Sequence, residues 1–118
     1  MVRAPAVLAA LSLLISGCGV PQELSKQAED VASIAAEGAL LAHDAVEGDT
    51  IASFRRVHAQ ALRKQVEELR PAIVDGRLSA LAASVSTELR RLEQNAAAAP
   101  VVERRLERAA AEADELAK

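Results

Sequence analysis

The sequence predicts an all-α fold, a small alanine-rich four-helix bundle with up-down-up-down topology. Apolar residues recur at spacings of three and four residues throughout residues 22–118, which is the period of an amphipathic helix. No stretch shows the strict alternation of apolar and polar residues that is typical of a strand. Gly48, Pro71, Gly76 and Pro100 interrupt the pattern about once per short helix, so antiparallel hairpins explain it better than one long coiled coil.

Residues 1–17 have the layout of a secretory signal peptide. Arg3 and the amino terminus supply positive charge, residues 6–15 are apolar apart from Ser12, and small residues occupy positions 16 and 17. A membrane-spanning helix needs about 20 apolar residues, and this run is shorter and ends in Gly and Pro residues. The sequence therefore favours a segment that is cleaved after export over a permanent transmembrane anchor.

The end of this segment, Ile15-Ser16-Gly17-Cys18, resembles the lipobox of bacterial lipoproteins: a large aliphatic residue, two small residues and a cysteine. The resemblance implies cleavage between Gly17 and Cys18, a lipid on the Cys18 thiol, and acylation of the new amino terminus by a fatty acid such as palmitate. Two or three acyl chains anchor a protein stably, whereas one holds it only marginally. Residues 18–21 would then be the lipidated cysteine and a very short tether. The alternative is an ordinary secreted protein with a stray thiol.

Composition limits what the rest of the chain can do. Removal of residues 1–17 from the 118-residue chain leaves 101 residues, with 13 basic and 17 acidic side chains and a net charge of −4, enough for one domain over residues 22–118. Phe54 is the only Phe, Tyr or Trp in the sequence. Because nucleic-acid stacking uses aromatic faces, we expect no nucleic-acid partner. Alanine buries little area, so we expect a thin core between closely packed helices.

The first predicted helix covers residues 22 to about 46. Its packing stripe is a narrow seam of mostly small residues, which lets a neighbouring helix approach closely. The other side of the helix is acidic: residues 19–49 contain seven acidic residues and one lysine, a net charge of −6. The seam consists of Leu24, Ala28, Val31, Ala35, Gly38, Ala42 and Ala45, and Ile34 and Leu41 widen it.

The second predicted helix begins after Gly48, with Asp49 or Thr50 as its N-cap, and ends or kinks at Pro71. Its predicted apolar stripe includes the lone aromatic residue and a histidine. The stripe consists of Ile51, Phe54, His58, Leu62, Val66 and Leu69, and Ile73 and Val74 are expected to continue the apolar cover.

The third predicted helix covers residues 77 to about 97, after a turn at Asp75-Gly76. The fourth begins at Pro100, since proline suits the first position of a helix. The third stripe consists of Leu78, Leu81, Val85, Leu89 and Leu92, and the fourth of Val102, Leu106, Ala109, Ala113 and Leu116.

The two histidines are candidate ligands, because bundle interiors hold haem and di-iron centres. A di-iron motif needs Glu three residues before each histidine, but Leu40 precedes His43 and Arg55 precedes His58. Across a hairpin centred near residue 48 the two histidines differ in height by roughly four residues, about 6 Å. We therefore expect no metal and no cofactor, and interpret His58 as a packed side chain opposite Gly38.

A basic stripe of Arg56, Arg63 and Arg70 recurs every seven residues on the face of the second helix opposite its apolar stripe. These arginines are candidate contacts for anionic lipid headgroups or an acidic polymer. The alternative, which we favour, is that carboxylates pair with them, either locally, as Glu67 with Arg63, or from the acidic first helix. Residues 50–91 carry eight basic and four acidic side chains, a net charge of +4, which suits pairing between helices.

The sequence contains no phosphate loop, zinc-protease helix or nucleophile elbow. We therefore interpret the protein as a non-enzymatic lipoprotein of the bacterial cell envelope that serves as a membrane-anchored helical protein-interaction module. Lipid on Cys18 would hold it on the cell membrane or the outer membrane, with the domain outside the cytoplasm. The identity of the protein partner is not encoded in any motif.

Two alternative functions follow from other features. The chain resembles the murein lipoprotein family in being a small, alanine-rich, helical lipoprotein that ends in lysine, here Lys118, and this resemblance implies a covalent link to peptidoglycan. The Gly and Pro breaks depart from that family's single long helix, and in a bundle Lys118 would return to the membrane end. The second alternative is a ligand-binding bundle with a pocket around Phe54 and His58.

Overall fold

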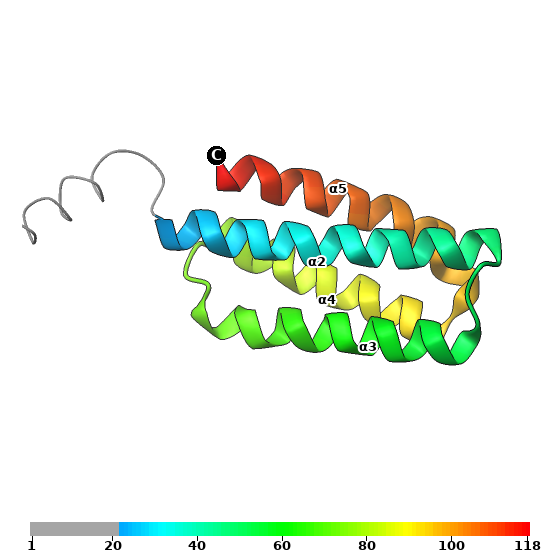
Figure 1. The fold of residues 1–118 in the computed structure, drawn as a ribbon. Helices are drawn as coiled ribbons and strands as arrows, with labels where there is room; N and C mark the ends of the chain where they lie inside the picture. Colours follow the sequence, from blue (N-terminus) through cyan, green and yellow to red (C-terminus); the bar gives the residue numbers. More distant parts are fainter. Residues whose placement is uncertain (1–21) are drawn as a thin grey trace, which may run out of the picture.

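The computed structural model describes residues 22–118. The chain forms four long helices, α2 (Gln22–Glu47), α3 (Ala52–Leu69), α4 (Gly76–Gln94) and α5 (Ala99–Ala117), with short 3₁₀ turns η1 (Arg70–Ala72) and η2 (Ala96–Ala98) at two connections. The helices alternate in direction and pack into one bundle (Figure 1), and no strand occurs in this part of the chain. The predicted fold class is confirmed. The predicted signal peptide, the cleavage site after Gly17, the lipidated Cys18 and the tether of residues 18–21 lie outside the described residues.

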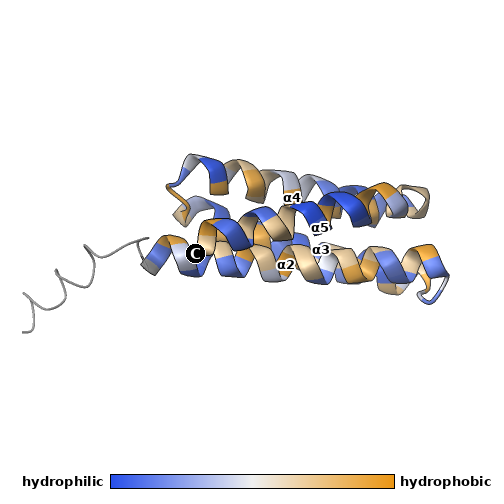
Figure 2. Ribbon diagram, turned by 90° about the horizontal axis from the view of Figure 1, so that it is seen from above, coloured by the Kyte–Doolittle hydropathy of each residue, from blue (hydrophilic) through white to orange (hydrophobic). Residues whose placement is uncertain are grey.

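The pair formed by α2 and α5 has the most extensive packing in the bundle, followed by the pair of α3 and α4. Small residues on both sides let α2 and α5 approach closely: Ala35 and Ala42 of α2 and Ala113 of α5 are fully buried. In Figure 2 hydrophobic and hydrophilic segments alternate along each helix, so each helix has one face for the core and one for solvent. Ten of the 22 buried apolar residues among residues 22–118 are alanines.

Gly38 is the tightest point of the seam on α2. A Cβ atom added there would lie 2.8 Å from Leu89 Cδ2 of α4 and 2.8 Å from Leu106 Cδ1 of α5. Leucine methyl groups of two other helices therefore close over the α2 backbone at Gly38, and any side chain there would have to displace both. The prediction that Gly38 makes room for His58 is wrong, since α4 and α5 occupy that space.

The turn between α2 and α3 differs from the predicted capping. Gly48 has φ +75°, and the Asp49 amide donates a hydrogen bond of 2.8 Å to the Asp44 carbonyl, which closes the end of α2 in the manner of a Schellman motif. Asp49 is thus held against the end of α2, two residues before the N-cap position of the next helix. The N-cap of α3 is Ile51, without a side-chain hydrogen bond, so the predicted capping by Asp49 or Thr50 is wrong.

The other two connections are stabilised by side-chain caps. Asp75 accepts a hydrogen bond of 2.9 Å from the Leu78 amide and so caps α4. At the other end, α4 stops earlier than predicted because Asn95 is extended and its side chain accepts a 3.0 Å hydrogen bond from the Ala97 amide, which starts η2. Pro100 lies in the first turn of α5, as predicted.

The predicted apolar stripes of α2, α4 and α5 are buried, except that Leu24, Ala45, Leu81 and Leu116 are only partly buried, whereas the stripe of α3 is correct only in its second half. Leu62 and Val66 are fully buried, but Ile51 and Phe54 are exposed. Val74, expected in the apolar cover, is 95 % exposed. The first half of α3 therefore presents a different face to the core from the one that the pattern predicts.

Arg55 occupies the core side of α3 in place of the aromatic residue. It is buried next to the fully buried Ala59, and its Nε donates a hydrogen bond of 2.9 Å to the Leu92 carbonyl in the last turn of α4. Carbonyl groups in the last turn of a helix lack helical partners and attract cations. The arginine thus covers the core with its methylene groups and closes the end of α4 with its guanidinium group.

The start of α2, the turn η1 and the chain end lie at one end of the bundle (Figure 1). Ser25 Oγ donates a 2.7 Å hydrogen bond to the Ala117 carbonyl, and Gln27 Nε2 donates a 3.0 Å hydrogen bond to the Ala72 carbonyl. We call this the proximal end, and the end with the α2–α3 turn and η2 the distal end. This arrangement is the one predicted from an up-down-up-down path.

The close contact at Gly38 makes a stability prediction. Gly38→Leu should lower the free energy of unfolding by about 1 to 3 kcal/mol, because its side chain would have to displace Leu89 and Leu106. Thermal melts followed by circular dichroism measure the change. Gly76→Leu is the matched control, since no atom lies within 4 Å of a Cβ there. Equal melting temperatures for Gly38→Leu and wild type would contradict the packing described.

Candidate interaction surface

A row of exposed apolar side chains runs along the first half of α3. Ile51, Phe54 and Val57 are 71 %, 53 % and 66 % exposed, and their spacing of three residues places them along one side of the helix. We call these three residues the distal stripe. Contiguous exposed apolar side chains of this size mark interaction sites more often than single ones do. The only aromatic residue of the chain therefore lies on the surface and not in the core.

The predicted pocket around Phe54 and His58 is not an internal one. The two rings pack edge to face, with centroids 5.4 Å apart and planes at 72°, but Phe54 is mostly exposed and His58 is only half-buried. The contact orients the Phe54 ring at the surface. The two residues thus contribute to the distal stripe and its edge, and not to an enclosed binding site.

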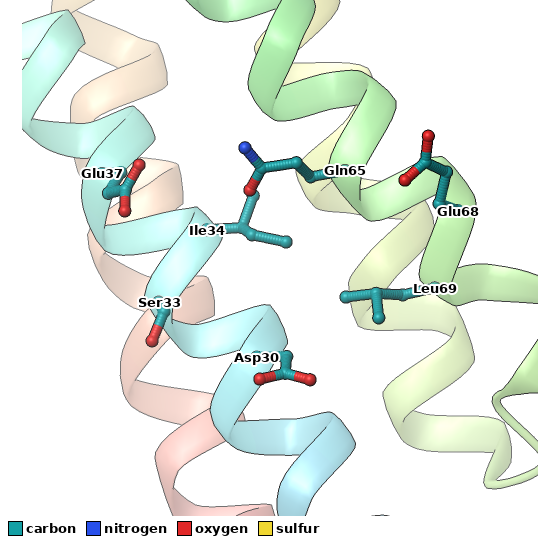
Figure 3. Close-up of a pocket in the computed structure, with 7 residues that line it drawn as sticks. All are labelled: Asp30, Ser33, Ile34, Glu37, Gln65, Glu68 and Leu69. Carbon is teal, nitrogen blue, oxygen red and sulfur yellow. The ribbon is translucent and has the colours of Figure 1, made fainter.

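A hollow of about 350 Å³ lies between α2 and α3 (Figure 3). In Figure 3 the side chains of Ile34 and Leu69 lie across from each other between the two helices, with carboxylates around them. Such a hollow has an apolar centre and an acidic edge. Its lining residues are Asp30, Ser33, Ile34, Glu37, Gln65, Glu68 and Leu69.

A longer groove follows the outer side of the α2–α5 pair. Two adjoining hollows, of about 610 and 440 Å³, share Ala36, Ala110 and Asp114. Leu40 is 65 % exposed in this groove, and alanines from both helices make up most of its floor. We call it the α2–α5 groove. Its lining residues are Glu29, Ala32, Ser33, Ala36, Ala39, Leu40, His43, Glu103, Glu107, Ala110, Ala111 and Asp114.

His43 bridges the distal part of this groove. Its Nδ1 lies 3.1 Å from Glu103 Oε2 of α5, and its Nε2 lies 3.9 Å from Glu47 Oε1 of α2. The hydrogen bond to Glu103, together with the negative charge of that carboxylate, raises the pKa of His43 above 6.5. His43 is therefore an exposed side chain that joins α2 to α5, as its place far from the seam suggests.

The predicted basic stripe is largely paired with carboxylates. Arg63 Nη2 lies 3.0 Å from Glu93 of α4, and Arg70 Nη1 lies 3.0 Å from Glu67 within α3. The predicted pair of Arg63 with Glu67 is wrong, because α4 brings Glu93 within reach. Arg56 is exposed. Arg63 thus pairs between helices, but with α4 and not with the acidic first helix as the charge balance suggested, and Arg70 pairs within α3.

A further carboxylate ties α4 to α5. Glu88 is more than nine-tenths buried, and its Oε1 lies 2.9 Å from Arg91 Nη1 and 3.1 Å from Arg105 Nη1 of α5. Its Oε2 is buried without a hydrogen-bond partner among residues 22–118. Both arginines are half-exposed, so the two ion pairs lie at the edge of the helix interface. The pair with Arg105 holds α4 against α5.

The two histidines lie in different surroundings in the described part of the chain. Within residues 22–118, no group of three or more His, Cys, Asp or Glu residues lies close enough to hold a metal ion. His43 contacts Glu103, whereas His58 contacts Phe54, so the two histidines have different neighbours. Of the helices from α2 to α5, none is both long and apolar enough to span a membrane.

The chain end lies at the proximal end of the bundle. The Lys118 ammonium group lies 2.8 Å from Glu115 Oε1, and both side chains are exposed. The neighbouring Ala117 carbonyl accepts the hydrogen bond from Ser25 near the start of α2. The described residues fold as a bundle. The resemblance to the murein lipoprotein family would instead imply a single long helix.

Comparison with protein-family models, curated proteins and solved structures finds no match to the chain. What the protein does is therefore inferred from its own residues and geometry.

The contact between His43 and Glu103 makes a pH prediction. Because the folded-state pKa of His43 is raised above 6.5, the protonated pair contributes stability below pH 6.5 and this contribution disappears as the pH rises through the folded-state pKa. An NMR titration of the His43 ring should give a pKa above 6.5 in the wild type and a lower one in Glu103→Gln. Glu112→Gln, on the same helix and exposed, is the control. An unchanged His43 titration in Glu103→Gln would contradict the contact.

Proposed function

We propose that the protein is a non-enzymatic lipoprotein of the bacterial cell envelope that acts through protein contacts of its helical bundle. Acyl groups on Cys18 hold it on the outer side of a membrane, and no cofactor takes part. The distal stripe is the observation that carries the proposal. Three large apolar side chains, one of them the only aromatic residue, stay in water at the distal end of the bundle, the end opposite the start of α2.

The bundle separates the anchor from the stripe by a defined distance. Cys18 precedes the first residue of α2 by only a few residues, and α2 has 26 residues, which at 1.5 Å per residue is about 39 Å. A rigid domain of that length holds the distal stripe clear of the lipid headgroups. Large apolar and aromatic side chains in such a position suit contact with another protein, where they become the buried centre of an interface.

Two exposed side chains at the proximal end suit contact with lipid headgroups. Val74 is almost fully exposed there, and Arg77, three residues later, is also exposed. An apolar and a basic side chain near an anionic membrane surface both lower the free energy of contact. Arg70 and Lys118 lie at the same end, but carboxylates already pair with them. The proximal end therefore favours a bundle that stands upright on the membrane.

Anchorage is tested by Cys18→Ser. The expected result is an unprocessed precursor or a chain that no longer partitions into detergent, because the acylated thiol is lost. Labelling with a fatty-acid probe and partition into a detergent phase measure both effects. In a matched control, a cysteine at the exposed Ser84 of the Cys18→Ser chain should not restore labelling. A Cys18→Ser chain that is labelled and partitions like wild type would rule out the lipoprotein assignment.

The upright orientation is tested with a fluorophore at either end of the bundle. Gly76→Cys marks the proximal end and Asp49→Cys the distal end; Gly48 is avoided because its φ of +75° disfavours any side chain. On anionic vesicles, headgroup-labelled lipid should quench the probe at position 76 more strongly than the probe at position 49. The reverse order would overturn both the orientation and the membrane assignment of the proximal end.

A further inference from the structure

Two exposed apolar surfaces, the distal stripe and the α2–α5 groove, remain uncovered in the bundle. They lie on different helices: the stripe belongs to α3, whereas the groove lies along α2 and α5, and in Figure 1 α5 is at the top of the bundle and α3 at the bottom. We propose that the distal stripe of one copy docks into the α2–α5 groove of a second copy, so that parallel copies associate side by side through two different surfaces. The inference rests on the proposed function in one respect, that anchorage places the copies on one membrane.

The shapes of the two surfaces are complementary. The stripe is a ridge on a single helix, because Ile51, Phe54 and Val57 all project into solvent from α3. The groove lies between two helices, and its alanine floor leaves room for a third helix to approach closely. The exposed Leu40 in this groove gives the ridge an apolar partner. A helix ridge that lies in a groove between two helices is a common mode of recognition.

The charges at the edges of the two surfaces have opposite signs. Lys64 is exposed on α3 seven residues after Val57, which places it two turns further along the same side of the helix. Glu103, Glu107 and Asp114 line the groove on the α5 side, and Glu29 lines it on α2. Docking would place the Lys64 ammonium group against the acidic edge of the groove, which favours this pairing over contact between two grooves.

The stripe lies at the height of the distal part of the groove. Because α2 ends at Glu47 and α3 begins at Ala52, the first ten residues of α3 run beside the last ten of α2. The contact of His43 with Glu103 places the matching part of α5 at this level too. In two upright copies on one membrane, the stripe of one is therefore level with Leu40, His43 and Glu103 in the groove of the other. Confinement to a surface also raises their effective concentration.

The symmetry of this contact has a measurable consequence. A surface that binds a different surface on the next copy does not close at the dimer, so each added copy leaves one free stripe and one free groove. The assembly is therefore expected to contain species larger than dimers. A pairing of like with like would stop at two copies.

The test uses the full acylated chain in vesicles of phosphatidylcholine and phosphatidylglycerol, treated with a carbodiimide that joins lysines to carboxylates. Wild type should give a ladder of cross-linked species beyond the dimer. Phe54→Asp, which disables the stripe, and Leu40→Asp, which disables the groove, should each lose the ladder. An equal mixture of the two variants should regain dimers and nothing larger, since one keeps an intact groove and the other an intact stripe.

Controls separate this outcome from unfolding and from non-specific association. Both substituted residues are largely exposed, so melts followed by circular dichroism should match wild type; Val57→Asp and Ala111→Asp are a second pair of variants for the same surfaces. Val74→Asp, at the proximal end, should keep the ladder. Wild type that stays monomeric on vesicles, a mixture that fails to pair, or loss of the ladder in Val74→Asp would each overturn the inference.

The same samples distinguish this inference from the proposed function. An anchored chain that stays monomeric contradicts self-association alone. A chain that forms the ladder but does not partition into vesicles contradicts the lipoprotein assignment alone.

Discussion

The close approach of α2 to its neighbours is the constraint on which the rest of the structure depends. Nearly half of the buried apolar residues are alanines, each of which gains little from burial, so the helices must come near enough for many small contacts to add up. Gly38 permits this, because Leu89 and Leu106 lie directly over its backbone. The bundle consists of two closely packed pairs, α2 with α5 and α3 with α4, and the contact at Gly38 joins α2 of the first pair to α4 of the second.

The alanine-rich core also explains why large apolar side chains remain outside. Arg55 reaches the end of α4 and covers the core at a level where Phe54 would otherwise pack, so the aromatic ring stays at the surface. Leu40 is exposed for a related reason, since the alanines beside it already fill the contact between α2 and α5. The bundle is stable without these side chains in its interior, which leaves them available for contacts with another molecule.

Much of the fold could be predicted from the sequence, because Gly48, Pro71, Gly76 and Pro100 set the limits of the helices and the apolar spacing marks their buried faces. Two features required the structure. The spacing of apolar residues identifies only apolar core positions. It therefore could not predict that the charged Arg55 is buried and closes the end of α4. The α2–α5 groove depends on which helices become neighbours, although Leu40 within an acidic helix was a visible sign. The lipobox at Cys18 remains a prediction.

The hydrogen bond from Ser25 to the Ala117 carbonyl brings the two ends of the folded chain together at the same end of the bundle. A pulling force applied between them would therefore act across α2 and α5 like the opening of a zipper. It would separate the two helices one turn at a time from the proximal end, and would not slide their whole lengths past each other. Peeling of this kind needs less force than shear over the same contact area. Any attachment of the chain end to an immobile structure would thus make this domain a mechanically soft link.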